Sequence, residues 1–462
     1  MLGKALLWPE PSLVFARGQQ ERIDDPKFGL ITYGPYDRNV GTNPPDEVNV
    51  FLIAVQNQFT RVKALLDNFE RNVPTKWKTV KFPFPGFRTL YRTKLSIPTK
   101  PDEAVYIRDE DLVTVLGASD FSKFSTEFIQ VMRRKLQEAI EKSDSASNTV
   151  YFVQVPPNVA SKADTFQQIS GLGVRELIKV AGVQCNAKTQ LITSNSLEPA
   201  DMADNLWNLT LAAYVKAGGV PWKLKEIPPA SMFIGMAYGI RKDEGGQTIF
   251  TGLAQVFNKF GEQVEMAALD FESGDYAFDP TTKSYHLNRE PMRKLISAAL
   301  ERYTQQIGEP PATAVLHKTT DFNEEERNGA LDSLKGTSHI DMVHVVESTL
   351  SRAFGFSETT SRGTFWPMDE NRGLLYTTGW VESVATYPGI GSPSPLEVVR
   401  NYGATGLATL AKQIFALTKM DWDTTRVMIR EPATVDYARR VADVIKAGLK
   451  AELLLRDIRY YL

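Results

Sequence analysis

Residues 231–240 read SMFIGMAYGI, an apolar run with the length of a buried strand. Two more strand patterns follow, TIFTGLAQVF (248–257) and QVEMAALDF (263–271), and DEGGQ (243–247) predicts a turn between the first two. Met232, Ile234 and Met236 alternate along the first run, so they should fill one side of a sheet. Three successive strands of this kind predict an antiparallel sheet.

Downstream of these strands the pattern changes to alternating helices and strands. The expected elements are a helix at 289–308, a strand at 313–320, a helix at 323–334, a strand at 340–349, and late helices at 404–418 and 433–448. Three antiparallel strands followed by such an alternation is the element order of an RNase H-like fold.

Upstream, residues 46–200 alternate buried strands and amphipathic helices, which predicts an α/β layer with a small, parallel, Rossmann-like sheet. The expected elements are strands at 49–55, 148–156 and 189–197, with helices at 59–69, 122–147 and 174–183. A helix at 203–217 should stop at Gly218-Gly219, since Pro221 prevents its resumption. The expected division is a linker-like segment at 1–45 with one strand candidate (12–18), a first domain at 46–202 and a second at 203–462.

The composition is that of an ordinary globular protein, with 42% hydrophobic and 23% charged residues. Lys and Arg total 53 against 55 Asp and Glu, which argues against coating nucleic acid through global charge but leaves room for a local basic cleft. Cys185 is the only cysteine, so an internal disulfide is excluded and a structural zinc site is not expected. Neither a signal peptide nor a membrane span is indicated, and a cytoplasmic location is expected.

The stretch KAGGVPWKL (216–224) resembles the signature at the junction of the MID and PIWI domains of Argonaute proteins. Further likenesses are VLHKTTDFNEEE (315–326), Thr189-Gln190, EPATVDYARRVADVI (431–445) and the closing Tyr460-Tyr461-Leu462. The likeness covers nearly the whole chain. A length of 462 residues leaves room for MID and PIWI domains but not for the N-terminal and PAZ domains of long Argonautes, so the chain is similar to short prokaryotic Argonautes. The resemblance implies a MID domain at 46–202 and a PIWI domain at 203–462.

The resemblance also implies a pocket for the 5′-phosphate of a guide strand. Its residues would be Arg175, Lys179, Gln190, Lys216 and Leu462. Arg175 and Lys179 are four apart and share one helix face, a spacing that more often marks a solvated surface. Arg175 stands where the family has Tyr or His, and arginine can both stack and bind phosphate in bidentate fashion.

Some relatives hold a divalent ion between the carboxylate at the position of Leu462 and the phosphate. Hard oxygen ligands of this kind favour Mg²⁺. Ala212, four residues before Lys216, lacks the polar group that the family often has there, which weakens the expectation of a metal.

Metal-dependent cleavage by this fold needs clustered carboxylates that hold two ions about 4 Å apart. The resemblance places the family's acidic positions at Ala237, near His317 and Lys318, and near Arg439. None of these is an acid, and a cation repels metal. Asp270, Asp321, Glu324 and Asp436 lie nearby in sequence and read more simply as surface charge or helix caps. No nuclease activity is expected.

The resemblance therefore implies a nucleic-acid-binding subunit that loads a small guide RNA and recognises complementary single-stranded DNA without cleaving it. Short Argonautes of this type form a heterodimer with an APAZ-domain effector and act in prokaryotic defence against plasmids and phage. ITYGPYD (31–37) favours a sirtuin-like, NAD-consuming effector, with a TIR domain or a nuclease as alternatives. Two other classes stay open: a guide-directed endonuclease with a rearranged site that uses Asp270 or Asp436, and a scaffold that binds only its partner.

Overall fold

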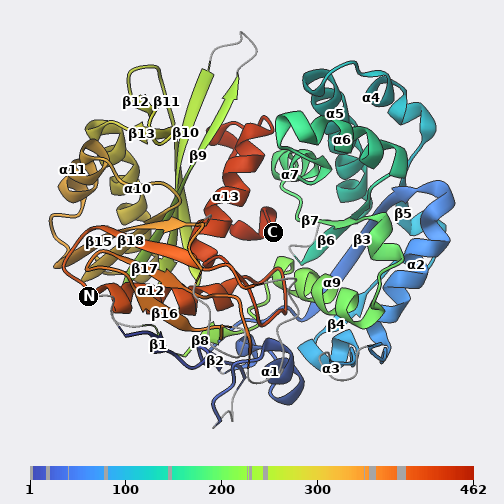
Figure 1. Cartoon of the computed structure of the whole chain (residues 1–462). Helices are drawn as coiled ribbons and strands as arrows, with labels where there is room; N and C mark the ends of the chain where they lie inside the picture. The colour runs from blue at the N-terminus through green and yellow to red at the C-terminus, as the bar shows by residue number, and fades with distance from the viewer. Residues whose placement is uncertain are drawn as a thin grey trace.

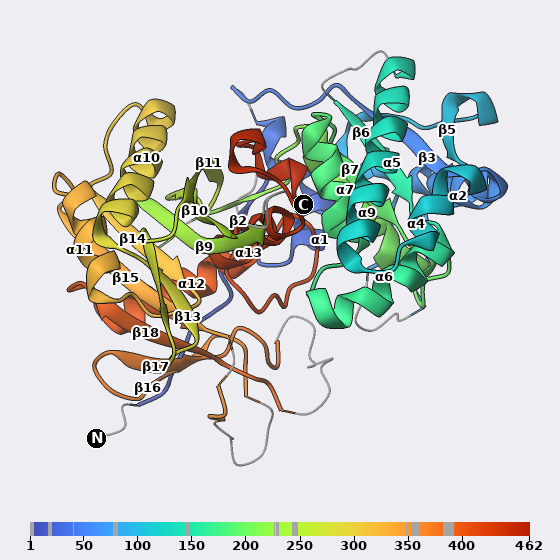
Figure 2. The same cartoon turned by 90° about the horizontal axis from the view of Figure 1, so that it is seen from above.

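The computed structural model describes residues 4–16, 21–39, 41–76, 82–143, 148–225, 227, 231–242, 248–347, 349–352, 360–381 and 392–462. The chain forms two lobes, and its last residues lie between them in both views (Figures 1 and 2).

The first lobe contains the parallel sheet that the alternation predicts. Its strands are β3 (Glu47–Val55), β4 (Lys94–Ser96), β5 (Ala104–Ile107), β6 (Thr149–Gln154) and β7 (Thr189–Ile192), and every pairing among them is parallel. Its helices are α2 (Phe59–Asp67), α3 (Phe87–Tyr91), α4 (Val113–Gly117), α5 (Phe121–Lys142), α6 (Pro157–Ser170), α7 (Val174–Gln184), α8 (Ser194–Leu197) and α9 (Met202–Lys216). Leu52, Ile53 and Ala54 are all buried, as expected for a central strand covered on both faces.

One strand of this lobe is shorter than predicted. The expected strand at 189–197 ends at Ile192, and Thr193 begins the short helix α8. The Thr193 hydroxyl accepts a hydrogen bond from the backbone N–H of Ser196, and the Ser196 hydroxyl is bonded in return by the N–H of Thr193. This reciprocal capping satisfies the first turn of a helix, so the chain turns where the apolar pattern alone would continue.

The second lobe is built on a nine-stranded sheet. In spatial order the strands are β1 (Leu6–Leu7), β16 (Thr364–Pro367), β17 (Arg372–Leu375), β18 (Leu396–Tyr402), β15 (His339–Val346), β14 (Thr313–Lys318), β9 (Met232–Lys242), β10 (Thr248–Asn258) and β11 (Gln263–Phe271). β9, β10 and β11 form an antiparallel sheet. β14 pairs with β9 and β15 pairs with β14, both in parallel, which confirms the RNase H-like core. The predicted turn at 243–247 lies outside the described residues. A small hairpin of β12 (Tyr276–Asp279) and β13 (Ser284–Leu287) was not predicted.

Helices cover both faces of the second sheet. They are α10 (Arg289–Ile307), α11 (Glu324–Ser333), α12 (Leu407–Leu417) and α13 (Ala433–Lys446). Met232, Ile234 and Met236 lie in one core cluster on one side of the sheet, as predicted, and residues of α10 belong to the same cluster. On the opposite face of β9, a Cβ at Gly235 would lie 1.8 Å from the carbonyl oxygen of Thr434, so glycine is what lets α13 approach the strand.

The segment at 1–45, where it is described, is tied into both lobes, and its two short strands join the second. β1 pairs with β16, and β2 (Leu13–Val14) pairs with β8 (Lys223–Leu224). The carboxylate of Glu10 is 2.8 Å from Arg362 and 2.7 Å from Lys419. The short helix α1 (Pro26–Thr32) completes this part of the chain.

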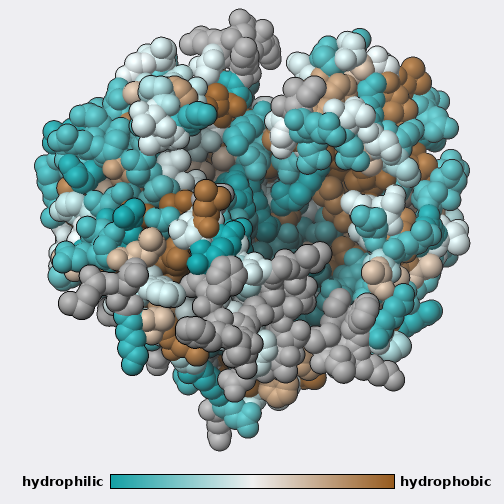
Figure 3. Space-filling view, viewed as in Figure 1, coloured by the Kyte–Doolittle hydropathy of each residue, from teal (hydrophilic) through white to brown (hydrophobic). Residues whose placement is uncertain are grey.

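A hollow separates the two lobes on the face shown in Figure 3, and hydrophilic residues dominate its walls. Within the described ranges no helix is both long and apolar enough to cross a bilayer.

Candidate nucleic-acid interface

A cluster of cationic and polar side chains forms where α7, the start of β7, the last turn of α9 and the final residues of the chain meet. The structure brings together the five residues that the sequence analysis assigned to it: Arg175 and Lys179 on α7, Gln190 on β7, Lys216 on α9, and Leu462. Four segments far apart in sequence therefore contribute to one site, which we call the cationic pocket.

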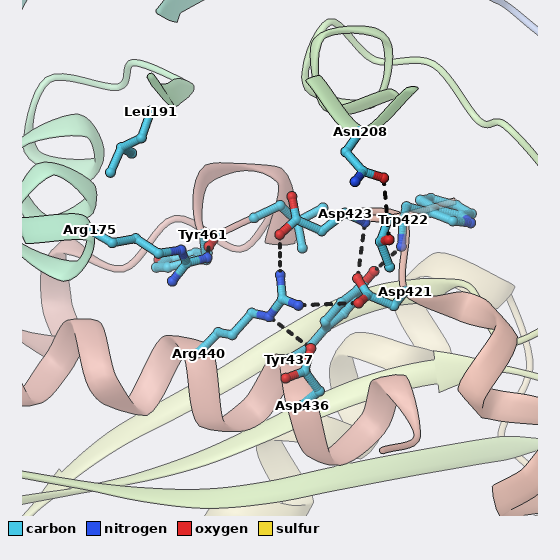
Figure 4. Close-up of polar contacts among 12 residues, drawn as sticks. Arg175, Leu191, Asn208, Asp421, Trp422, Asp423, Asp436, Tyr437, Arg440 and Tyr461 are labelled. Carbon is cyan, nitrogen blue, oxygen red and sulfur yellow. Dashed lines mark hydrogen bonds and ion pairs between the residues drawn. The ribbon is translucent and has the colours of Figure 1, made fainter. Parts of the chain in front are cut away.

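Helix α7 holds the end of the chain through its two cations. The Lys179 ammonium donates to the backbone oxygen of Thr189 at 2.7 Å and also to the backbone oxygen of Leu462. Arg175 donates to the backbone oxygen of Tyr461 at 2.6 Å (Figure 4). The spacing of four along α7 puts both side chains on the face that meets the chain end, rather than on a solvated surface.

Lys216 approaches the same place from α9, and its ammonium donates to the side-chain oxygen of Gln190. Lys179 and Lys216 are each only 1% exposed. Burial, together with the like charges of its neighbours, moves the pKa of Lys179 well below its usual range. Burial lowers the pKa of Lys216 to about 8. An anion entering the pocket would reverse both shifts, because an opposite charge favours the ammonium form.

A group of carboxylates around one arginine adjoins the cationic pocket (Figure 4). Arg440, on α13, lies 2.9 Å from Asp423, 3.3 Å from Asp421 and 2.8 Å from Asp436. Although burial opposes it, the charges of Arg440 and of the pocket cations lower the pKa of Asp423. Burial raises the pKa of Asp421 to about 6. We call these four residues the Arg440 cluster.

Ala237 and His317, which the resemblance aligns with acidic positions of the family, lie on the neighbouring strands β9 and β14, and Arg439 lies on α13. Ala237 lies on β9 between Gly235 and Gly239, whose missing side chains allow α13 to approach the strand closely. His317 is fully buried, and its Nδ1 lies 2.9 Å from the Thr434 hydroxyl. Burial lowers the pKa of His317 to about 3, so this imidazole stays neutral. The neighbouring Lys318 is buried and paired with Glu326 at 2.6 Å.

Arg439 fills the remaining degenerate position and already has three acidic partners. Its guanidinium is 3.0 Å from Glu347 and 2.9 Å from Asp436, and it also pairs with Glu431. Asp270, which the endonuclease alternative invoked, is 2.9 Å from Arg241. Among the described residues, no group of three or more His, Cys, Asp or Glu side chains could hold a metal ion.

The sequence analysis missed Asp423 and Arg440. The nearest signal is the pair of acids in Asp421-Trp422-Asp423, because alternate residues of an extended segment point the same way. Arg440 directly follows Arg439, but only the structure shows that the two guanidinium groups share Asp436 and otherwise have different partners: Arg439 pairs with Glu347 and Arg440 with Asp423.

Known proteins show what this arrangement is similar to. No protein-family profile matches the chain. The curated protein argonaute of Aquifex aeolicus (strain VF5) is 23% identical over 341 residues, which are 71% of this chain and 43% of that protein.

Solved structures agree over a larger part of the chain. The crystal structure of Aa-Ago with externally bound siRNA matches 99% of this chain and 56% of its own at a TM-score of 0.64 and 19% identity. Clostridium butyricum Argonaute, bound to a guide DNA and a 19-mer target DNA, matches 99% and 55% at a TM-score of 0.67 and 17% identity. The chain thus spans about half the length of the relatives it matches. The fold is a Rossmann-like MID lobe followed by an RNase H-like PIWI lobe.

Proposed function

We propose that this chain, which groups with the Argonautes by its curated relative and its fold, binds the phosphorylated 5′ end of a guide strand in the cationic pocket. The observation that carries the proposal is the convergence of Arg175 and Lys179 on the last residues of the chain, with Lys216 bonded to Gln190 beside them. The guide would then run along the hollow between the lobes and pair there with a complementary strand.

The chemistry of the pocket suits a phosphate ester. Lys216 now donates to the neutral oxygen of Gln190, and Lys179 donates to Thr189 as well as to Leu462. A phosphate oxygen would make stronger, charge-assisted bonds than the neutral acceptors do. Arg175 is about one-third exposed, so its guanidinium can turn from Tyr461 to a ligand. Binding would also raise the lysine pKa values and secure their charge.

We propose that the PIWI lobe recognises its target without cutting it. Ala237 and His317 supply no anion, and the Arg439 guanidinium lies among the carboxylates that would otherwise attract metal. Two-metal hydrolysis needs those carboxylates free to bind cations.

Mg²⁺ at the cationic pocket belongs to the proposal only as a companion of the guide phosphate. The pocket lysines already donate to the protein oxygens of Thr189, Leu462 and Gln190. These residues do not fit a metal site of the protein's own, so no step of the proposed function depends on the ion.

The guide, the target and the partner rest on the sequence resemblance. We propose a small RNA guide and a single-stranded DNA target. The proposed partner is an APAZ-domain effector that forms a heterodimer with this chain; a sirtuin-like effector is favoured over a TIR domain or a nuclease. The pair would act in prokaryotic defence. In the matched structures, Aa-Ago carries siRNA and the Clostridium protein carries guide and target DNA. Sequencing of co-purified oligonucleotides and mass spectrometry of attached proteins test these assignments.

The central test is the variant Lys179→Ala/Lys216→Ala. Removal of two charge-assisted contacts should weaken binding of a 5′-phosphorylated strand by about 2–4 kcal/mol. The same strand with a 5′-hydroxyl should lose little. A matched control is Lys335→Ala/Lys446→Ala, which removes the same charge from exposed positions. Equal losses for both strands would remove the pocket assignment.

The two alternatives have their own outcomes. Guide-directed cleavage in Mg²⁺ or Mn²⁺ that is abolished by Asp270→Ala or Asp436→Ala would establish an endonuclease and overturn the non-cleaving proposal. A purified complex that contains no oligonucleotide and does not bind added ones would support the alternative that the chain is a scaffold that binds only its partner.

A further inference from the structure

A loop residue beside the cationic pocket is fixed in place from two sides. Asp423 follows the short 3₁₀ turn η7 (Thr418–Met420). The backbone N–H of Thr425 donates to the side-chain oxygen of Asn208, on α9, at 3.2 Å. The N–H of Trp422 donates to the Tyr437 hydroxyl, on α13, at 2.9 Å. The loop is therefore held between the helix that ends in Lys216 and the helix that carries Arg440.

The charge around Asp423 does not balance within its own cluster. Arg440 is one cation shared by three carboxylates, those of Asp421, Asp423 and Asp436. Further positive charge acting on Asp423 comes from the cationic pocket: Lys216, then Arg175 and Lys179. The Asp423 side chain is 30% exposed. An ionised group of the same sign as the proposed ligand therefore adjoins the cationic pocket.

We propose that Asp423 is a specificity-determining residue of the cationic pocket, whose carboxylate weakens the binding of a 5′-phosphate relative to an uncharged 5′ end. The inference rests on the proposed function. It adds that the affinity of the pocket for a 5′-phosphate is lower than the three cations alone would give, because phosphate and carboxylate compete for Lys216, Lys179 and Arg175.

Removal of the Asp423 charge has two opposing effects on the affinity for a 5′-phosphate, and the larger effect decides whether the affinity rises or falls. Asp423 helps to keep Lys216 protonated, and each unit by which the lysine pKa falls costs at most about tenfold in affinity. The removed repulsion acts on a phosphate with close to two charges at neutral pH, in a partly buried site. The affinity gained from the removed repulsion should exceed the affinity lost through the lower pKa of Lys216. The difference should be clearer below pH 7, where Lys216 stays protonated.

The test is Asp423→Asn, which keeps the shape of the side chain and removes its charge. Binding is measured with one single-stranded oligonucleotide carrying either a 5′-phosphate or a 5′-hydroxyl, at pH 6.5–7 and with EDTA present. We expect the phosphorylated strand to bind about tenfold more tightly and the hydroxyl strand to change less than about twofold. The matched control Asp443→Asn, which removes an exposed charge on α13, should change neither.

The outcomes separate this inference from the function on which it rests. Unchanged or weaker binding of the phosphorylated strand by Asp423→Asn overturns the inference while the phosphate preference of the wild type stands. A phosphate preference that is missing from the wild type and from Asp423→Asn alike removes both. Asp423→Ser is the second variant, and equal thermal unfolding of all variants shows that Arg440, which keeps Asp421 and Asp436, still holds the loop.

Discussion

Lys216 is a buried ammonium at the last turn of α9, with a pKa lowered to about 8 by burial. The bound phosphate favours the charged form, so the complex holds the proton more tightly than the empty pocket does. Affinity for a 5′-phosphorylated strand should therefore be flat just below pH 8 and fall above it, by up to about tenfold per pH unit.

The measurement is the dissociation constant from pH 7 to pH 9.5, with a 5′-hydroxyl strand as reference. Lys216→Arg keeps its charge over this range and should flatten the profile. A wild-type profile that stays level to pH 9.5 would contradict a role for Lys216 in holding phosphate.

At this scale the sequence anticipated part of the site. Lys179, Gln190 and Lys216 could be named because their order and spacing match a family pattern. Asp423 and Arg440 could not, because their proximity to Lys216 arises only when the loop after α12 packs between α9 and α13. Nothing local to residues 421–426 indicates that packing.

At the scale of elements, the contact between β9 and α13 depends on Gly235. Gly235→Ala would place a Cβ 1.8 Å from the Thr434 carbonyl oxygen, a backbone atom that can move only with its helix. We expect a loss of about 2–4 kcal/mol in the free energy of unfolding, measured by chemical denaturation. Gly336→Ala, where a Cβ meets nothing within 4 Å, is the control and should be nearly neutral. Equal stability of the two variants would show that α13 can shift away from β9 without a measurable cost in the free energy of unfolding.

The elements themselves were predictable to different degrees. β9, β10 and β11 are long and strongly apolar, so their pattern is clear. β16 and β17 have four residues each, too few for any periodicity to show, and their pairing with β18 and β1 extends the sheet in a way that no local pattern indicates.

At the scale of the whole molecule, the N-terminal segment fastens to the second lobe through a buried ion group. The side chains of Arg362 and Lys419 are both 0% exposed and share the carboxylate of Glu10. Glu10→Gln leaves two buried cations without their anion, so we expect a loss of about 3–5 kcal/mol in the free energy of unfolding.

Denaturant titration measures this loss, and Glu110→Gln, at an exposed pair with Arg108, is the matched control. A Glu10→Gln variant as stable as the control would mean that the segment adds nothing to the stability of the lobe. Composition alone gave no hint of this attachment, because a segment rich in Gly and Pro reads as a linker whether or not it is packed.

Asp436 gives one carboxylate to two different surroundings: one oxygen is 2.9 Å from Arg439 and the other is 2.8 Å from Arg440. The two arginines are neighbours in sequence, yet Arg439 also pairs with Glu347 and Arg440 also pairs with Asp423. Substitutions at the two arginines should therefore not be energetically additive. A change of charge at one of them alters the ion pair of the other across the width of a single helix.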